Sequence, residues 1–347
     1  MPLSAVDSIT PAIEHVKQQL FRPFSLAQWT LLALVGMFAG ESCSGGGLNF
    51  NSLNLPSHSQ GAHRHWVASA PPDWVILGPL IALALITIPV VWLFLLYLNS
   101  RMRFVLFDSV VARRCAIGRM WRERRRPALE YFVWQVFLWL AFMAGMVVVV
   151  GLPLAAALLL GWISSPREHM APLILTGIAV FAAFTGWFVL SLVVHVFTKD
   201  FVVPQMALEN ISAFEGWRRL WRMLQSDKAG YLGYGAMKFI LAIAAAFVVG
   251  LLAVIAIILL LIPFGGLAAI TVIWAKVGGL TWNAVTITAA IVAAAVLLVM
   301  ILYVLALISV PVIVFFPAYS IYFFASRYSR LANLVYPPPP ILPLEPV

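Results

Sequence analysis

Long apolar runs constrain this chain more than any other feature of its sequence. A helix needs about 20 apolar residues to cross a ~30 Å hydrocarbon core, and runs near or above that length occupy most of the chain. Of the 347 residues, 63% are hydrophobic and only 10% are charged, with a mean hydropathy of +0.98. Soluble domains have about 25% charged residues. The sequence therefore predicts an all-α membrane protein and excludes a water-soluble globule.

About six transmembrane helices are predicted from these runs. They are 24–40, 74–98, 131–162, 171–197, 230–262 and 284–314. The first run has only 17 residues, near the lower limit for a span. We interpret it as a retained helix and not as a signal peptide, because Asp7 and Glu14 precede it. Pro153 is expected to bend its helix, Pro263 to end its helix, and the segment 264–284 to dip into the interface.

The N-terminal segment 1–23 is predicted to be a cytoplasmic amphipathic helix that lies on the membrane. Thr10 can cap its N-terminus, and Ile13, Val16 and Leu20 share one face. After it come a polytopic membrane domain, 24–334, and a proline-rich cytoplasmic tail, 335–347.

Lysines and arginines are concentrated on one side of the predicted helices. The segments 99–130 and 198–229 and the two termini hold eighteen of the 22, the opposite loops hold three, and Lys238 lies within a span. Basic residues favour the cytoplasmic face, so these segments and both termini are predicted to be cytoplasmic. Topology then accounts for the net charge of +9, and nucleic-acid binding is not expected.

A short apolar motif follows each pair of predicted spans. It reads FVLF from Phe104, FVVP from Phe201 and VFFP from Val314. The spacing corresponds to one helical hairpin plus one surface helix, so the sequence predicts three tandem hairpin repeats. For the third copy, chance similarity between apolar tetrapeptides remains an alternative.

The basic segments are predicted to contain interfacial helices. In the second segment, Ser212 and Glu215 fit a capping box. An apolar stripe follows, formed by Phe214, Trp217, Leu220, Trp221 and Leu224. Arginines on the other side of this helix suit a membrane surface with acidic lipids. The helix can bind lipid or a membrane-protein partner, or it can serve topology and anchoring alone. The candidate contact residues are Arg113, Arg114, Arg119, Arg122, Arg124, Arg125, Arg126, Arg218, Arg219 and Arg222.

Lys238 is the one clear charge inside an apolar run. Its ammonium can snorkel to the surface or make a structural hydrogen bond, or it can contact a substrate.

The outer loop, 41–73, holds several residues of metal-binding type, but their spacing fits no recognised site. These residues are Glu41, Cys43, His58, His63 and His65. Nucleotide-binding and hydrolase motifs are missing, and no acidic residue lies in the middle of a span. The sequence therefore predicts no enzymatic activity, no cofactor and no metal.

Three segments resemble a known group of proteins. They are LFRPFSLAQW (20–29), GGGLNFN (45–51) and DFVVPQMALENISAFEGWRRLWRML (200–224). They resemble an uncharacterised prokaryotic integral-membrane family, a domain of unknown function. That family is similar in turn to the membrane domain of some glycerophosphoryl diester phosphodiesterases. The resemblance implies a multi-pass protein of the cytoplasmic (inner) membrane and a link to lipids. It implies no hydrolysis, because the phosphodiesterase domain has no room in this chain.

The predicted function is that of a non-catalytic membrane scaffold or accessory module. It would contact anionic lipid or a membrane-protein partner through its basic interfacial helices. The alternative is a small-solute transporter or channel that uses Lys238 and the broken helices near Pro153 and Pro263. A polar cavity that reaches Lys238 would favour this alternative, and a dry, packed bundle would argue against it.

Overall fold

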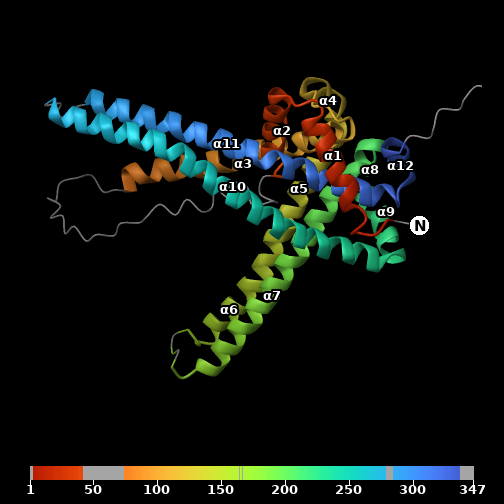
Figure 1. The fold of residues 1–347 in the computed structure, drawn as a ribbon. Coiled ribbons are helices and arrows are strands. Elements are labelled where there is room, and N and C mark those ends of the chain that lie inside the picture. Colours follow the sequence, from red (N-terminus) through yellow and green to blue (C-terminus); the bar gives the residue numbers. More distant parts are fainter. Residues whose placement is uncertain (1–2, 42–73, 164, 166, 279–283, 337–347) are drawn as a thin grey trace, which may run out of the picture. The chain divides into compact units, whose positions relative to one another are not determined.

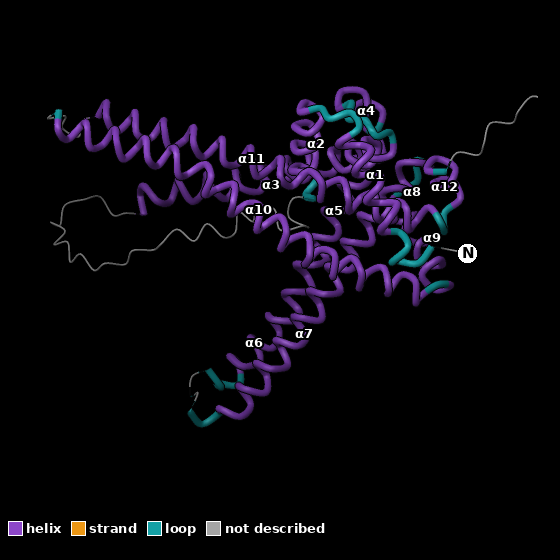
Figure 2. Tube along the Cα trace, viewed as in Figure 1, coloured by secondary structure: helices purple, strands orange, loops and turns teal. Residues whose placement is uncertain are grey.

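The computed structural model describes residues 3–41, 74–163, 165, 167–278 and 284–336. Within these residues the regular elements are helices (Figure 2). The described chain forms two compact units, which we treat separately. Their names refer to the sequence only: the central unit contains Trp121–Lys228 and Phe324–Tyr336. The flanking unit contains Leu3–Met120 and Ala229–Phe323.

The helices have the following bounds. They are α1 (Ile9–Phe21), α2 (Leu26–Phe38), α3 (Trp74–Val111), α4 (Ile117–Glu123), α5 (Arg125–Met146), the π-helical η2 (Val147–Gly151), α6 (Leu152–Leu159), α7 (Met170–Phe197), the π-helical η3 (Thr198–Val202), α8 (Val203–Glu209), α9 (Ala213–Ser226), α10 (Lys228–Val277), α11 (Ala284–Ala325) and α12 (Ser329–Val335). Figure 1 labels most of them.

Five helical segments of the described chain are long and apolar enough to cross a membrane. They are Ile81–Val111, Arg125–Leu159, Met170–Glu209, Lys228–Thr271 and Val285–Ala325. Their apolar side chains are widely exposed, for example Leu85 at 69% and Phe247 at 73%. In water such exposure would be very unfavourable, whereas lipid tails solvate it. The predicted class, an all-helical membrane protein, is therefore confirmed.

The predicted first span, 24–40, contains only a short helix. α2 has 13 residues and is about 20 Å long, less than a bilayer core. It lies along the basic end of α3, where Asn99 Nδ2 donates to the Phe38 carbonyl at 2.9 Å and Arg103 donates to the Ala39 carbonyl. These side chains satisfy carbonyls that the end of a helix leaves free. The count of six spans is thus corrected to five long apolar helices, and residues 42–73 lie outside the described chain.

The long helices continue further than predicted. α3 runs into the predicted cytoplasmic segment without a break, and Phe104 to Phe107 are buried in the flanking unit. α7 continues through η3 and α8 to Glu209. Both motifs therefore lie inside helices that the sequence predicted to end earlier.

Prolines do not end these helices. Pro263 lies inside α10, which continues to Val277, and α11 likewise contains Pro311 and Pro317. The predicted end of a helix at Pro263 is therefore wrong for the described residues, whereas the dip of 264–284 into the interface stays a prediction. Membrane helices tolerate proline, because neighbouring groups and local adjustments satisfy the freed carbonyl.

The helix that contains Pro153 is irregular at the predicted place. The π-helical turn η2 immediately precedes α6, in which Pro153 takes one of the first two positions. Such turns adjust a helix that loses a regular hydrogen bond. α5 and α6 pack against α7 as a hairpin (Figure 1). Gly145 lies where a Cβ atom would overlap the indole ring of Trp187.

α1 packs against protein and not only against the membrane. Val16 and Leu20 are buried in the flanking unit, whereas Ile13 is 42% exposed. Its N-cap is Ser8 and not the predicted Thr10. Two polar residues, His15 and Gln19, share the buried face and donate to backbone carbonyls of α3. The predicted amphipathic face is therefore partly used inside the protein.

Candidate functional site

Most of the predicted contact arginines are at the surface. Eight of the ten are exposed, namely Arg113, Arg114, Arg119, Arg122, Arg125, Arg126, Arg218 and Arg222. Arg124 and Arg219 are partly buried. The contacts of each arginine show whether its guanidinium stabilises the fold or is available to a ligand.

Arg113 and Arg124 have structural contacts. Arg113 adopts a left-handed conformation (φ +55°) just after α3, and its guanidinium donates to Gln18 Oε1 at 2.7 Å. Arg124 donates to the Ala207 carbonyl in the last turn of α8. An arginine that satisfies a carbonyl at the end of a helix stabilises that end. These two residues contribute to helix termination.

α9 starts where the sequence predicted. Ser212 is its N-cap and its hydroxyl accepts from the Glu215 amide at 3.3 Å. This bond is the first half of a capping box. The helix then packs on η3, where a Cβ atom on Gly216 would lie 2.7 Å from Val202 Cγ1. Trp217 Nε1 donates to Thr198 Oγ1 at 2.9 Å. The N-cap and the close packing fix the rotation of α9 about its axis.

The face of α9 that is buried in the protein covers only part of the predicted apolar stripe. The buried residues are Ala213, Gly216 and Leu220. Phe214 is 71% exposed and Trp221 is 55% exposed. These two aromatic residues lie on the same face as Arg218 and Arg222, because residues four, seven and eight positions apart share a helix face. The predicted apolar stripe is thus divided: Leu220 is buried in the protein, whereas Phe214 and Trp221 are exposed at its edge, next to the arginines. We call the exposed side chains of Phe214, Arg218, Trp221 and Arg222 the aromatic–arginine face.

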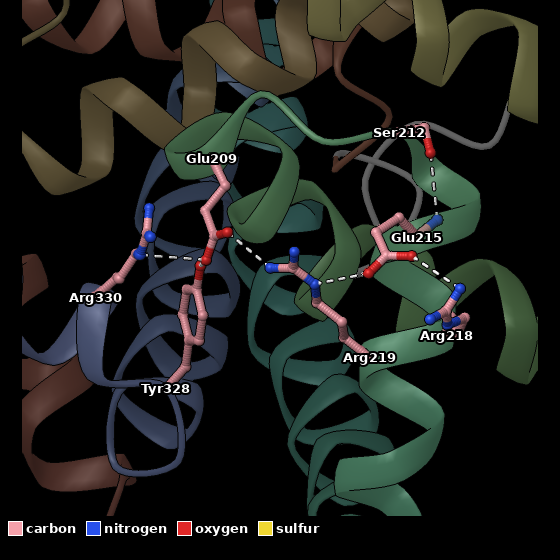
Figure 3. A network of polar contacts seen from close by, with 7 residues as sticks. All are labelled: Glu209, Ser212, Glu215, Arg218, Arg219, Tyr328 and Arg330. Atoms are coloured by element: carbon pink, nitrogen blue, oxygen red, sulfur yellow. Dashed lines mark hydrogen bonds and ion pairs between the residues drawn. The ribbon is translucent and has the colours of Figure 1, made fainter.

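Arg219 points to a polar network instead (Figure 3). Its Nη1 lies 2.7 Å from Glu209 Oε2 and its Nε lies 3.1 Å from Glu215 Oε1. On the other side of Glu209, Arg330 Nε is 3.4 Å from Oε1, and the Tyr328 hydroxyl donates to the same oxygen. Glu209 thus joins the end of α8 to the middle of α9 and to the start of α12.

The electrostatics of this network favour charged partners. A carboxylate at the C-terminal end of α8 faces the negative end of the helix dipole, and the two arginines compensate for it. Hydrogen bonds to Glu209 and Glu215 raise the pKa of Arg219. Burial, together with the hydrogen bond to Glu209, raises the pKa of Tyr328. Arg219 is therefore engaged in ion pairs of the fold, although its side chain is still 30% exposed, and this makes it a weaker candidate for lipid contact than Arg218 or Arg222.

A second ion pair joins α12 to the chain just after α9. Arg327 Nε and Nη2 lie 3.0 and 2.8 Å from Asp227 Oδ2. Both networks were missed by the sequence analysis. No local spacing connects Asp227 with Arg327 or Glu209 with Arg330, because the partners are about a hundred residues apart.

Lys238 has aromatic surroundings in the flanking unit. The residue is 6% exposed, and its Nζ lies 5.8 Å from the ring centroids of Tyr234 and Phe316. A cation over the face of an aromatic ring is attracted by the quadrupole of the ring. Tyr234 also stacks on Tyr319, with 5.2 Å between centroids. Lys238 therefore has a structural environment in the contact between α10 and α11.

One buried ion pair was not predicted. Arg103 donates to Glu41, and both side chains are at most 6% exposed. The sequence predicted Arg103 in a cytoplasmic segment and Glu41 in the outer loop, on opposite sides of the membrane. The ion pair places both at the same part of α3, so the predicted separation is wrong for Glu41. A signal existed, since Glu41 directly follows an apolar run. The other residues named for the outer loop, Cys43 and three histidines, lie outside the described chain.

Comparison with known protein families shows which family the chain belongs to. Residues 3–334 match a family of unknown function, DUF7544. The chain belongs to this family. No curated protein and no solved structure matches it. Membership of an uncharacterised family is thus confirmed, and no link to the phosphodiesterase membrane domain is shown. The members of DUF7544 have no established activity to transfer, so a functional proposal rests on the geometry of this chain.

Proposed function

We propose that this protein is a non-catalytic membrane scaffold or accessory module. It contacts anionic lipid headgroups through arginines on its surface helices and so presents a fixed, lipid-bound surface to a membrane-protein partner. The observation that carries this proposal is the aromatic–arginine face of α9, where two exposed aromatic side chains alternate with two exposed arginines.

The place of α9 in the chain supports a position at the membrane surface. It begins four residues after α8, which ends one apolar segment, and it ends two residues before α10, which begins the next. A helix between two spans is held near headgroup level. Tryptophan is enriched at this level because its ring is amphipathic. We therefore place Phe214 and Trp221 among the headgroups and upper acyl chains.

The arginines of this face suit phosphate groups. Arg218 is 68% exposed and only 3.7 Å from Glu215 at its nearest, which is a weak ion pair. Each basic residue near an acidic leaflet contributes about 1 kcal/mol of attraction. Arg218 and Arg222 together would favour anionic lipid by roughly 2 kcal/mol. The exposed arginines between α3 and α5 add to the same attraction.

The orientation follows from the distribution of charge. The basic ends of the helices are proposed to face the cytoplasm of a prokaryote, as the excess of basic residues on one side indicates. Contacts in the flanking unit support the same side for the N-terminal helix and for the last turns of α3 and α11. The Ala5 carbonyl accepts from Tyr319, and His15 contacts both Val110 and Tyr322. The N-terminal helix therefore packs on the last turns of α3 and α11.

The hairpin repeat remains part of the proposal. Phe104, Phe201 and Phe316 lie in the three copies of the apolar motif, and each is at most 1% exposed. Each copy occurs in the last part of a long helix, and a short helix follows, namely α4, α9 and α12 respectively. The burial of the phenylalanine in each copy and the same order of helices after it support three repeats of one unit. That unit consists of two spans and a surface helix.

A transporter is the less supported alternative. Its main candidate, Lys238, lies against Tyr234 and Phe316, which favours a structural role. Pro263 does not break α10. A pathway through the described helices would need polar groups along its length.

Lipid selectivity tests the proposal. The purified full chain would be titrated with short-chain phosphatidylglycerol or phosphatidylcholine, and its thermal midpoint recorded. We expect phosphatidylglycerol to stabilise the wild type more, and the double variant Arg218→Gln, Arg222→Gln to lose most of the difference. Arg167→Gln is the matched control, because Arg167 is exposed and lies in the loop predicted to face the opposite side. Equal stabilisation by both lipids, or no change in the double variant, would contradict the proposal.

A further inference from the structure

His15 lies where α1, α3 and α11 meet in the flanking unit. The residue is 7% exposed. Its Nε2 is 3.0 Å from the Val110 carbonyl oxygen of α3, and its Nδ1 is 3.2 Å from the Tyr322 hydroxyl of α11. A carbonyl can only accept, so Nε2 carries a proton. In the neutral ring Nδ1 then accepts from Tyr322. The ring joins three helices in its uncharged form.

Other contacts attach α1 at the same place. Gln19 Nε2 donates to the Ser109 carbonyl at 3.1 Å, and the Tyr319 hydroxyl donates to the Ala5 carbonyl at 3.1 Å. Val16 and Leu20 are buried beside them. Of the side chains that make these hydrogen bonds, His15 is the one that titrates near neutral pH. The charge state of His15 therefore affects how strongly α1 is held against α3 and α11.

The surroundings of His15 oppose a positive charge. The groups that face the ring are Gln19 on α1, Arg113 at the end of α3 and Tyr322 on α11, and of these only Arg113 is charged. The Tyr322 hydroxyl can turn to accept from a protonated ring, so hydrogen bonding alone does not exclude the charge. Burial lowers the pKa of His15 below its usual 6.5, and the positive charge of Arg113 lowers it further.

We propose that α1 is a proton-sensitive latch, closed by neutral His15 and loosened when that ring is protonated. Loosening α1 would release an apolar face, with Val16 and Leu20, that also suits a membrane surface. The attachment is full above the unperturbed pKa of about 6.5. It weakens as the pH falls from there towards the lowered pKa, since the detached helix then binds the proton more readily. The change is at most about tenfold in the docking equilibrium for each pH unit. This inference is independent of lipid binding.

Hydrogen–deuterium exchange of the full chain tests the latch. Protection of the α1 amides would be measured between about pH 5 and pH 8 and corrected for intrinsic exchange. We expect protection in the wild type to be constant above about pH 6.5 and to fall below it. The amides of α9 serve as the internal reference and should not change. Uniform loss in both helices would indicate general unfolding and would overturn the proposal.

Two variants assign the effect to His15. His15→Gln keeps a donor for the Val110 carbonyl but cannot take a charge, so its α1 protection should not depend on pH. Arg113→Gln removes the facing charge and also the hydrogen bond to Gln18 of α1. Its α1 protection should therefore be lower at every pH, but the loss on acidification should begin to level off at a higher pH than in the wild type. The proposal fails if wild-type α1 protection does not depend on pH, or if His15→Gln retains the wild-type dependence. If His15→Gln does not fold, the Arg113→Gln variant decides. The proposal holds if the loss of α1 protection levels off at a higher pH than in the wild type, and it fails if the levelling pH is unchanged or lower.

Discussion

Arg219 of α9 and Glu209 of α8 form an ion pair, with 2.7 Å between Nη1 and Oε2. The pair holds one arginine of α9 inside the fold, while Arg218 and Arg222 remain exposed. It thereby distinguishes neighbouring residues that the sequence analysis had treated alike. The side chain of Glu209 is only 12% exposed and also accepts from Tyr328, so it contributes to the contact between three helices.

Glu209→Gln should therefore destabilise the central unit. Loss of the negative charge leaves Arg219 and Arg330 without their shared partner, and hydrogen bonds that involve a charged group contribute about 1.5–3 kcal/mol. Partial exposure reduces the effect, and we expect about 1–2 kcal/mol. Thermal unfolding in detergent measures it. Arg126→Gln is the control, because its ion pair with Glu130 is long (3.7 Å) and exposed. Equal loss in both variants would remove the special role of Glu209.

Glu41→Gln should destabilise the flanking unit more strongly. It leaves Arg103 buried without its carboxylate, and breaking a buried pair costs about 3–5 kcal/mol. The double variant Glu41→Leu, Arg103→Met should recover much of this loss, because an apolar pair has no charge to desolvate. Denaturant titration of the three proteins measures both effects. A double variant that is less stable than Glu41→Gln would contradict this explanation.

Gly145→Ala should weaken the hairpin of α5 and α7. A Cβ atom there overlaps the Trp187 ring, which also donates from Nε1 to the Phe142 carbonyl at 3.3 Å. Overpacking of this kind costs about 1–3 kcal/mol. Gly186→Ala on α7 is the control, since its Cβ would meet nothing within 4 Å. The thermal midpoints of the two variants are compared, and we expect Gly145→Ala to unfold at the lower temperature. A Gly145→Ala variant as stable as Gly186→Ala would show that α5 and α7 are further apart than the structure has them.

The sequence predicted the class of fold, the positions of the long apolar helices and the N-cap at Ser212. These features depend on local composition and spacing. It did not predict the contacts of Arg103 or His15, because their partners lie far away along the chain. Proline was also misleading: Pro263 and Pro317 are tolerated inside helices, where sequence rules for soluble proteins place an end. The sequence did not show which stripe residues of α9 are buried in the protein, because this depends on the close approach of Gly216 to Val202 as well as on the stripe.

The position of the aromatic–arginine face in the membrane tests the central claim most directly. A spin label would be attached to Trp221→Cys and, separately, to Leu220→Cys, in chains whose Cys43 and Cys115 are replaced by serine. In liposomes, collisions with oxygen and with a water-soluble nickel complex report the depth of each label. We predict that the label at 221 is mobile and lies at headgroup level, whereas the label at 220, a buried position, is immobile and protected from both reagents. A label at 221 that is fully exposed to water, or that is immobile and protected like the one at 220, would contradict the proposed contact with lipid.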